Sequence, residues 1–384
     1  MATVQEPAAI DPTTIDPATI DPGTIDPVTI DPVTIDMDKL MSFVFRAIDE
    51  VGATLNTALV VMGDKLGLYR ALAGAGPLSP GELAGRTGIS ERYAQEWLNA
   101  QAAGGYVDYD PDSGRYVLPP EQTVALTDED SPAYLPGFFQ IALGSVVDSP
   151  RVMQAAKTGA GIGWHDHVAD VHEGCERFFR PGYHAHLVAE WLPALDGVIG
   201  KLQRGARVAD VGCGHGASTV LMAEAFPAST FEGFDYYKGS VDTATARATA
   251  AGVGGRAQFQ VAPASGYPGQ GYDLVTMFDC LHDMGDPAGA ARHVRDSLAP
   301  DGTWMIVEPA AGDRVEDNMN PVGRAYYAFS TLLCTPSSLA QEVGLALGAQ
   351  AGEARIRAIV TAAGFGTFRR VAGTPFNTVF EAKP

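Results

Sequence analysis

The half of the chain after residue 200 consists of short apolar runs that alternate with stretches of helical pattern. The apolar runs are "ARVADV", "TFEGFD", "AQFQV", "YDLVTMF" and "GTWMIV", and all of them lie between residues 206 and 307. Strands that are separated by helices pair in parallel, because a parallel pair needs a long crossover connection. We therefore predict a parallel sheet with helices on both faces and a ligand at the carboxyl ends of its strands.

A glycine-rich turn, "VGCGHG", connects the first of these strands to the first helix. Gly212, Gly214 and Gly216 let the chain turn tightly and let a ligand approach the backbone. Asp235 ends the second strand about twenty residues later, where a carboxylate accepts hydrogen bonds from a ribose diol. Asp210 precedes the glycines, and its charge would repel a pyrophosphate but hold an ammonium group, directly or through water. This combination favours S-adenosylmethionine (SAM) over NAD as the ligand.

From about residue 40 to residue 384, the chain resembles the class I SAM-dependent methyltransferases. The resemblance rests on "VADVGCGHGAST", "GFDYY", "YDLVTMFDCLHDMGDP" and "GTWMIVEP", and it is greatest for a bacterial group with an N-terminal winged-helix domain. It implies a Rossmann-like α/β fold whose seven-stranded sheet ends in the antiparallel strand "FNTVFEA". It also implies SAM as the cofactor and S-adenosyl-L-homocysteine as its product. The residues expected around the cofactor are Asp210, Gly212, Gly214, Gly216, Asp235, Tyr236, Ala264, Ser265, Asp279 and Tyr183.

His282 lies in "FDCLHDMGDP", directly after the fourth strand, and its neutral imidazole is suited to taking a proton near pH 7. The segment is similar to that of plant-type small-molecule O-methyltransferases, whose catalytic base is the histidine of an H-D-aromatic turn. Met284 replaces the aromatic residue here. That family also has a glutamate after the next strand to orient the histidine, and Glu308 stands in register. The alternative is that His282 caps the following helix or bonds the backbone, although Asp286 is the expected cap.

The segment "NMNPVGRAYYAFSTLLCTPSS" is rich in aromatic and thiol side chains and has few charges. We interpret it as a wall of the pocket for the methyl acceptor. The residues expected to contact a flat apolar ring are Tyr326, Tyr327, Phe329 and Leu333. At helical spacing, such residues are alternatively plain core.

Residues 1–36 contain the repeat "IDPTTIDPATIDPGTIDPVTIDPVTID". A proline at every fifth position removes backbone donors and prevents a helix, so we predict an extended, poorly ordered tail. The alternative is that its isoleucines bind a partner or a neighbouring subunit.

Residues 37–130 show the order helix, turn, helix and hairpin, which is typical of a winged-helix domain. Ser79 and Ser90 are the expected N-caps, and "YVDYDPDSGRYVL" is the expected hairpin. Such domains often bind DNA, but Glu91 and Glu96 lie on the second helix, so dimerisation or substrate capping is favoured. Residues 131–200 are predicted as a helical linker and cap, and residues 201–384 as the SAM-binding catalytic domain.

The formal net charge of −20 disfavours nucleic acids and anionic membranes as partners. The four cysteines form no C-x-x-C pair, so neither a disulfide framework nor a zinc knuckle is indicated. Ligand types do gather between His165 and His186, namely His165, His167, His172 and Cys175, but their spacing fits no standard zinc pattern. We therefore expect no metal, at this region or at His282. Without a signal peptide or a spanning segment in the sequence, a cytoplasmic location is expected.

These features predict a homodimeric SAM-dependent methyltransferase that acts on a small metabolite. O-methylation of a hydroxylated or aromatic acceptor is favoured, with His282 as general base and Glu308 as its orienting residue. One alternative is methylation of carbon, nitrogen or sulfur by proximity alone. Another is a SAM-binding regulatory protein that works through its winged helix.

Overall fold

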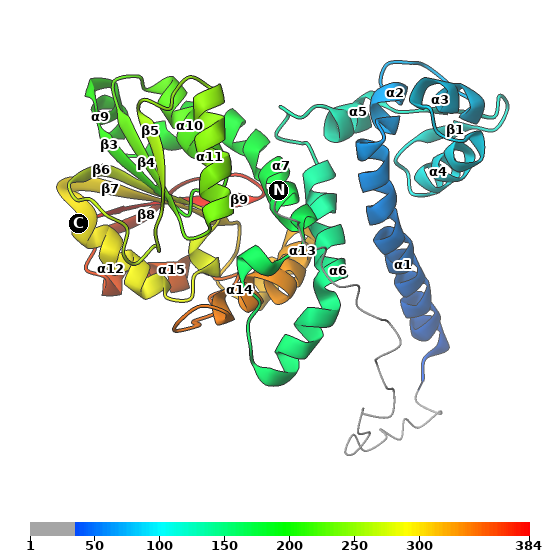
Figure 1. Ribbon diagram of the computed structural model, residues 1–384. Coiled ribbons are helices and arrows are strands. Elements are labelled where there is room, and N and C mark those ends of the chain that lie inside the picture. The colour runs from blue at the N-terminus through cyan, green and yellow to red at the C-terminus, as the bar shows by residue number, and fades with distance from the viewer. Residues whose placement is uncertain (1–34) are drawn as a thin grey trace, which may run out of the picture. The chain divides into compact units, whose positions relative to one another are not determined.

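Figure 1 shows the fold of the computed structural model, which describes residues 35–384. The predicted Ile-Asp-Pro tail, apart from its last two residues, lies outside the described part of the chain. A boundary at Gly52 separates two compact units, and the second unit runs from Ala53 to Pro384. Helix α1 (Met37–Lys65) crosses this boundary, so it begins in the first unit and ends in the second.

A helix-turn-helix and a two-stranded hairpin follow α1, as predicted for a winged-helix domain. Tyr116 of the hairpin also bridges Leu78, which adds a third short strand segment. The domain has its own core, in which Leu68, Trp97 and Leu98 are no more than 2% exposed. Its elements are α2 (Leu68–Leu72), α3 (Pro80–Thr87), α4 (Glu91–Ala103), β1 (Asp108–Asp110), β2 (Arg115–Val117) and α5 (Pro120–Thr127).

Helices fill the region between the winged-helix domain and the sheet, as the sequence predicts. They are α6 (Pro136–Thr158), η4 (Trp164–Asp166), α7 (Ala169–His186), η5 (Leu187–Trp191), α8 (Leu192–Ala194) and α9 (Val198–Arg204). The long helices α6 and α7 pack against each other through the Phe138 and Phe178 rings. Among residues 35–384, no helix combines the length and the apolarity needed to cross a membrane.

The sheet has seven strands in the order β5-β4-β3-β6-β7-β9-β8. Strands β3 to β7 pair in parallel, whereas β9 runs antiparallel to both β7 and β8, so the predicted antiparallel strand "FNTVFEA" is confirmed. The edge strand β8 has no counterpart among the predicted strands, because "TFRRVAG" carries two arginines and no apolar run. The strands are β3 (Arg207–Val211), β4 (Thr230–Asp235), β5 (Ala257–Val261), β6 (Tyr272–Phe278), β7 (Leu298–Pro309), β8 (Thr367–Gly373) and β9 (Asn377–Lys383).

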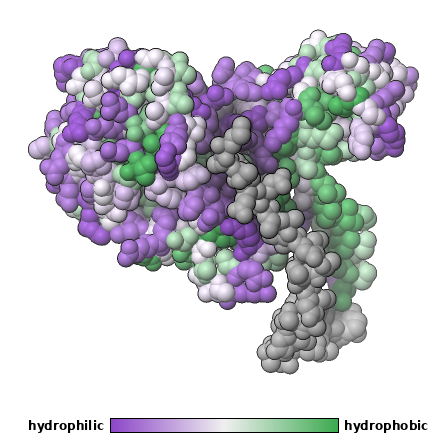
Figure 2. Space-filling view, in the orientation of Figure 1, coloured by the Kyte–Doolittle hydropathy of each residue, from purple (hydrophilic) through white to green (hydrophobic). Residues whose placement is uncertain are grey.

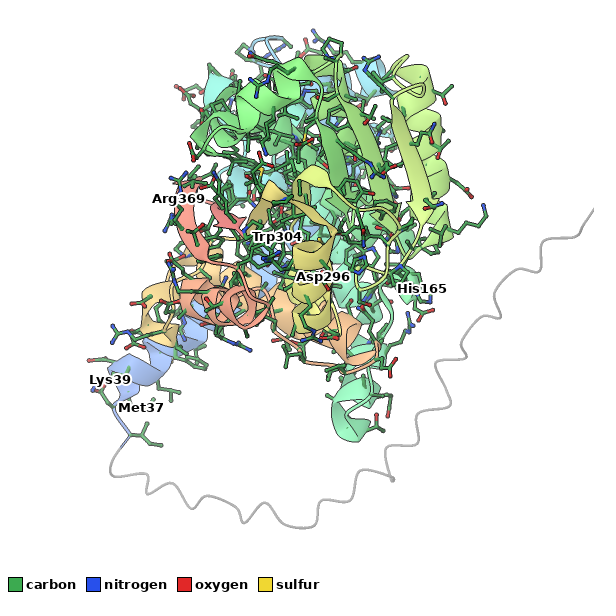
Figure 3. The ribbon with its side chains drawn as sticks, turned by 90° about the vertical axis from the view of Figure 1, so that its left-hand side faces the viewer. Met37, Lys39, His165, Asp296, Trp304 and Arg369 are labelled. Carbon is green, nitrogen blue, oxygen red and sulfur yellow. The ribbon has the colours of Figure 1, made fainter. Side chains whose placement is uncertain are left out.

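Helices cover both faces of the sheet (Figure 1). α9, α10 (Ala217–Ala225) and α11 (Lys238–Ala250) contribute to one core, and α12 (Pro287–Ser297) and α15 (Gly352–Ala362) to the other. Alternate residues of a strand serve the two cores: Met305 and Val307 lie in the first, Trp304 and Ile306 in the second. Trp304 has no exposed surface and lies well inside the domain (Figure 3).

Parallel pairing brings the carboxyl ends of β3, β4, β6 and β7 to one edge of the sheet. Gly212 and Asp279 directly follow β3 and β6, whereas Asp235 and Glu308 lie at the ends of β4 and β7. This is the edge at which the sequence predicts a ligand. The remaining short elements are η6 (Leu281–Asp283), η7 (Val315–Asn318), α13 (Pro321–Phe329), η8 (Ser330–Cys334) and α14 (Thr335–Leu339).

Two serines precede helices of the winged-helix domain, and only one of them caps its helix through the side chain. Ser79 Oγ accepts a hydrogen bond from Glu82 N at 3.3 Å, and Glu82 Oε2 accepts one from Ser79 N at 2.7 Å. The Ser90 side chain makes no capping hydrogen bond.

We expect Ser79→Ala to lower the free energy of unfolding by about 1 kcal/mol, because the backbone N–H of Glu82 loses its acceptor. Ser90→Ala is the matched control and should change it by less than about 0.5 kcal/mol. Urea unfolding of the full chain, followed by circular dichroism, measures both. Equal losses in the two variants would contradict the assignment of the cap.

Candidate active site

A cavity of about 340 Å³ opens at the carboxyl edge of the sheet. The turns after β3, β4, β5 and β6 line it together with residues of α6, α7, α13 and η8. Most of the residues predicted for the site meet in this cavity, although they come from distant parts of the chain. They are Tyr183, Gly212, Gly214, Asp235, Tyr236, Ala264, Ser265, Asp279, His282, Tyr326, Phe329 and Leu333.

Asp210 does not line the cavity. Its side chain leaves β3 on the face covered by α10, because it alternates with Ala209 and Val211, which belong to the opposite core. Asp210 Oδ2 accepts hydrogen bonds from the hydroxyls of Ser218 at 2.7 Å and Thr219 at 2.5 Å. The carboxylate therefore anchors the start of α10, and a contact with an ammonium group, directly or through water, stays a prediction.

Gly212 and Gly216 have different reasons to be glycine. Gly212 lines the cavity at φ +73°, and a Cβ there would lie 2.6 Å from Cys280 Sγ. Gly216 lies outside the cavity at φ +75°, and a Cβ there would lie 2.9 Å from Ala244 Cβ. Gly216 is therefore needed for packing against α11 and not for contact with a ligand.

Tyr327, which the sequence predicts for the acceptor pocket, does not line the cavity. Its hydroxyl lies 3.4 Å from Asn318 Nδ2.

Asp235 lines the cavity from the end of β4. Its Oδ2 accepts a hydrogen bond from Gly214 N at 3.0 Å, and its Oδ1 accepts one from Tyr237 N at 2.8 Å. Burial raises the pKa of Asp235, and the two backbone donors oppose that rise. Each carboxylate oxygen keeps a lone pair for a hydroxyl donor, so Asp235 fits a ribose diol such as that of SAM.

Asp279 follows β6 with a backbone φ of +50°, a value uncommon for residues other than glycine. Tyr183 Oη donates to its Oδ2 at 2.8 Å, and Asn377 Nδ2 donates to its Oδ1 at 2.7 Å. Burial and the nearby Glu308 carboxylate raise the pKa of Asp279 to about 8. A buried carboxylate in a strained backbone is typical of functional positions. Asn377 was missed from the sequence, because only the pairing of β9 with β7 brings it to this edge.

Glu308 holds the ring of His282. Nδ1 of His282 lies 2.7 Å from Glu308 Oε2, and Leu281 N donates to Glu308 Oε1 at 3.0 Å. The His282 and Glu308 side chains are only 5% and 2% exposed. Because the carboxylate accepts from Nδ1, the neutral ring keeps Nε2 as its acceptor nitrogen.

The charge state of His282 depends on its acidic neighbours. Burial disfavours the charged ring, but the carboxylates of Asp283 and Glu308 raise the pKa of His282 well above its ordinary value. Asp286 Oδ1 accepts from Gly289 N at 2.7 Å and caps α12, as predicted. His282 is therefore not the cap of that helix.

Aromatic and aliphatic side chains from α6, α7 and α13 form the apolar part of the wall. Phe138 stacks on Phe178 with ring centroids 4.4 Å apart, and it meets Phe329 edge-on at 5.2 Å. Tyr326 and Leu333 also line the cavity, as predicted. Phe138 and Phe178 were missed, because no motif indicates that the α6 and α7 pair lies over this edge of the sheet.

The histidines between His165 and His186 do not assemble a metal-ligand set. His167 Nδ1 lies 2.8 Å from Asp148 Oδ2, and His165 is 46% exposed near the edge of the domain (Figure 3). Within residues 35–384, one group of three potential ligands does come together, and it consists of His282, Asp283 and Cys334.

Two family models match the chain. Residues 54–128 match an Rv2258c-like winged helix-turn-helix domain, and residues 183–343 match a methyltransferase domain. The chain carries a methyltransferase domain.

Curated relatives of the methyltransferase domain include two named methyltransferases. The trans-aconitate 2-methyltransferase of Streptomyces avermitilis is 35% identical over 109 residues, which are 28% of this chain and 40% of the relative. The 27-O-demethylrifamycin SV methyltransferase of Amycolatopsis mediterranei is 29% identical over 139 residues, which are 34% of this chain and 51% of the relative. The chain thus spans about half or less of the length of these relatives.

Solved methyltransferase structures share the fold of nearly the whole chain. Mitomycin 7-O-methyltransferase MmcR superimposes with a TM-score of 0.64 at 17% identity, over 91% of this chain and 100% of that one. Human N-acetylserotonin methyltransferase in complex with SAM gives a TM-score of 0.62 at 17% identity, over 92% and 99%. The fold is therefore the seven-stranded class I methyltransferase sheet with an N-terminal winged-helix domain.

We expect Asp235→Ala to weaken SAM binding at least about tenfold, because the ribose hydroxyls lose a charged acceptor. Asp242→Ala is the matched control, since Asp242 pairs with Lys238 on α11 and lies outside the cavity. Isothermal titration calorimetry with SAM compares both variants with the wild type. An unchanged affinity in Asp235→Ala would remove Asp235 from the binding site.

Proposed function

We propose that this protein transfers a methyl group from SAM to a hydroxyl oxygen of a small, flat, largely apolar acceptor. The observation that carries the proposal is the His282 ring, which Glu308 holds by a 2.7 Å contact at the wall of the same cavity that Asp235 lines. A proton acceptor and a ribose-binding carboxylate thus share one site. The methyltransferase domain model that matches residues 183–343 supports the same activity.

When bound, SAM supplies an electrophilic methyl group on a sulfonium. The residues that would hold it are those of the glycine turn, Asp235 and Tyr236, with Ala264 and Ser265 beside its adenine ring. An alcohol or phenol attacks well only as its proton leaves, so a positioned base helps this acceptor more than it helps a thiol or an amine.

His282 would take the acceptor proton at Nε2. The Nδ1 proton stays hydrogen-bonded to Glu308, which stabilises the imidazolium that forms and keeps the ring in place. Asp279 lies at the same edge, where Tyr183 and Asn377 hold it. Its pKa is raised to about 8, and a positive charge beside it would favour its ionised form. The protein's contribution is then orientation, proton removal and a mainly apolar cavity.

The wall of the cavity supports an aromatic acceptor. Phe138 contacts both Phe178 and Phe329, and all three line the cavity. Flat rings pack well against such surfaces. MmcR is named for transfer to a mitomycin oxygen, and NcsB1 was solved with SAM and 2-hydroxy-5-methyl naphthoic acid. The net charge of −20 opposes nucleic acid as the acceptor.

His282→Ala should lower the rate of methyl transfer to a hydroxyl acceptor at least about a hundredfold, the scale of a lost general base. The measurement uses isotope-labelled SAM and a panel of phenols, alcohols, amines and thiols. His184→Ala is the control, because His184 is exposed on α7 and outside the cavity. Equal rates in the wild type and His282→Ala would leave proximity as the mechanism. Binding of SAM without any transfer would favour a regulatory role.

The rate should rise with pH as His282 loses its proton, because only the neutral ring accepts one. The acidic groups that face His282 are Asp283 and Glu308, and they raise its pKa; the thiol beside it belongs to Cys334. Glu308→Gln removes one of these charges, so it should move the rising limb of the kcat/KM profile to lower pH. The profile is measured in chelator-treated buffer. If kcat/KM rises at the same pH in the wild type and in Glu308→Gln, the proposed role of Glu308 would be contradicted.

We also propose that the protein is a homodimer through α1. Met37, Met41, Ile48, Val51 and Leu55 recur at helical spacing along α1 and are between 43% and 66% exposed. Figure 2 shows hydrophobic colours along this helix. An apolar stripe with steps of three, four and seven residues fits a second helix of the same kind.

The four free cysteines support the cytoplasmic location expected from the sequence.

Replacing Ile48 and Leu55 together by Glu should convert the dimer into a monomer, because two charges enter an apolar seam. Lys39→Glu on the same helix is the control and should stay dimeric, since Lys39 is an exposed charged residue. Size-exclusion chromatography with light scattering gives the mass. A monomeric wild type would contradict the proposed dimer.

A further inference from the structure

His282, Asp283 and Cys334 form a cluster of metal-ligating side chains in the cavity wall. One potential ligand atom from each residue lies within 4.8 Å of the other two. All three residues line the cavity. No sequence motif indicates the cluster, because Cys334 lies in η8, far along the chain from η6.

Two hydrogen bonds tie the segments that carry these ligands together. Gln341 Nε2 donates to Asp283 O at 2.8 Å, and Ser338 Oγ donates to Met284 O at 2.8 Å. Cys334 ends η8, a π-helical turn of the kind often found at functional sites. The ligand atoms are therefore carried by anchored backbone and not by a free loop.

Glu308 orients the His282 ring for binding a cation as well as for accepting a proton. Its Oε2 lies 2.7 Å from Nδ1, so the remaining Nε2 has a fixed direction. A carboxylate behind a histidine is the usual support of a metal-bound imidazole.

The proposed proton transfer does not use Asp283. Its Oδ1 is buried and lies 3.2 Å from His282 Nε2, and it has no other hydrogen-bond partner. Tetrahedral zinc with nitrogen, oxygen and sulfur ligands needs ligand atoms about 3.3 to 3.7 Å apart. The pair thus already has nearly the spacing that one ion requires.

We propose that His282, Asp283 and Cys334 bind a thiophilic divalent cation of the zinc type, with the fourth coordination position open to the cavity. Nitrogen, carboxylate oxygen and thiolate sulfur are the ligands that zinc takes in proteins. On binding, the Cys334 S–H bond breaks and a sulfur–metal bond forms. The charged His282 ring also releases its Nε2 proton, and both protons pass to the buffer. The thiolate and the carboxylate then balance the two charges of the ion.

The cation competes with the methyl acceptor. It occupies the lone pair of His282 Nε2, the same lone pair that accepts the substrate proton. This consequence rests on the proposed function, whereas the binding site itself does not.

Cobalt(II) tests the site without any methyl transfer. The full chain, first dialysed against a chelator, is titrated with Co²⁺ while its absorption spectrum is recorded. We expect a near-ultraviolet thiolate-to-cobalt band and the visible bands of tetrahedral cobalt, and both should disappear when Zn²⁺ is added. Cys334→Ser should abolish the thiolate band, and Asp283→Asn should weaken Zn²⁺ binding at least about tenfold.

Cys280→Ser is the matched control. Cys280 lines the same cavity, but its Sγ lies 3.3 Å from Val211 O and it belongs to no ligand group. Its variant should keep the thiolate band, and calorimetric binding of S-adenosylhomocysteine checks that every variant is folded. No band in the wild type, or a band that survives Cys334→Ser, would overturn the metal site.

A second arm tests the competition. Zn²⁺ should inhibit methyl transfer in the wild type, and a higher acceptor concentration should relieve the inhibition. Faster transfer with Zn²⁺ would overturn the competition while leaving the cobalt result intact. If no acceptor is methylated at all, the proposed function fails, and the cobalt spectrum still decides the metal site.

Discussion

The site depends on the parallel pairing of β3, β4, β6 and β7. Because these strands run in one direction, their carboxyl ends meet at one edge of the sheet and present Gly212, Asp235, Asp279 and Glu308 together. The contact between His282 and Glu308 follows directly, since β6 and β7 are neighbours and the turn after β6 folds back over the end of β7.

That edge gathers acidic side chains in a buried place. Asp235 and Asp279 both have raised pKa values because burial disfavours their charged forms, yet hydrogen-bond donors keep each of them in position. Such a site favours a ligand that brings positive charge, as a sulfonium does. The same surroundings favour the imidazolium form of His282, and they favour a divalent cation beside Cys334.

Strand ends were predictable from the sequence, and packing between distant segments was not. The sequence predicts the sheet, the glycine turn and Asp235 from the alternation of strands and helices. The pairing of Glu308 with His282 is predicted only through the resemblance to plant-type O-methyltransferases. Asp210 is predicted from the sequence as a ligand contact. Alternation along β3 instead directs its side chain toward α10, where it accepts hydrogen bonds from Ser218 and Thr219. Cys334 and Phe138 reach the cavity, and Asn377 reaches Asp279, only through tertiary packing, which no local pattern encodes.

In the proposed reaction, the methyl group goes to oxygen. The most direct test is to incubate the protein with ¹³C-methyl SAM and a mixed acceptor panel, and to locate the labelled methyl group in the product by NMR. We expect label on the oxygen of a hydroxylated aromatic acceptor. Label on carbon, nitrogen or sulfur, with hydroxyls untouched, would contradict it.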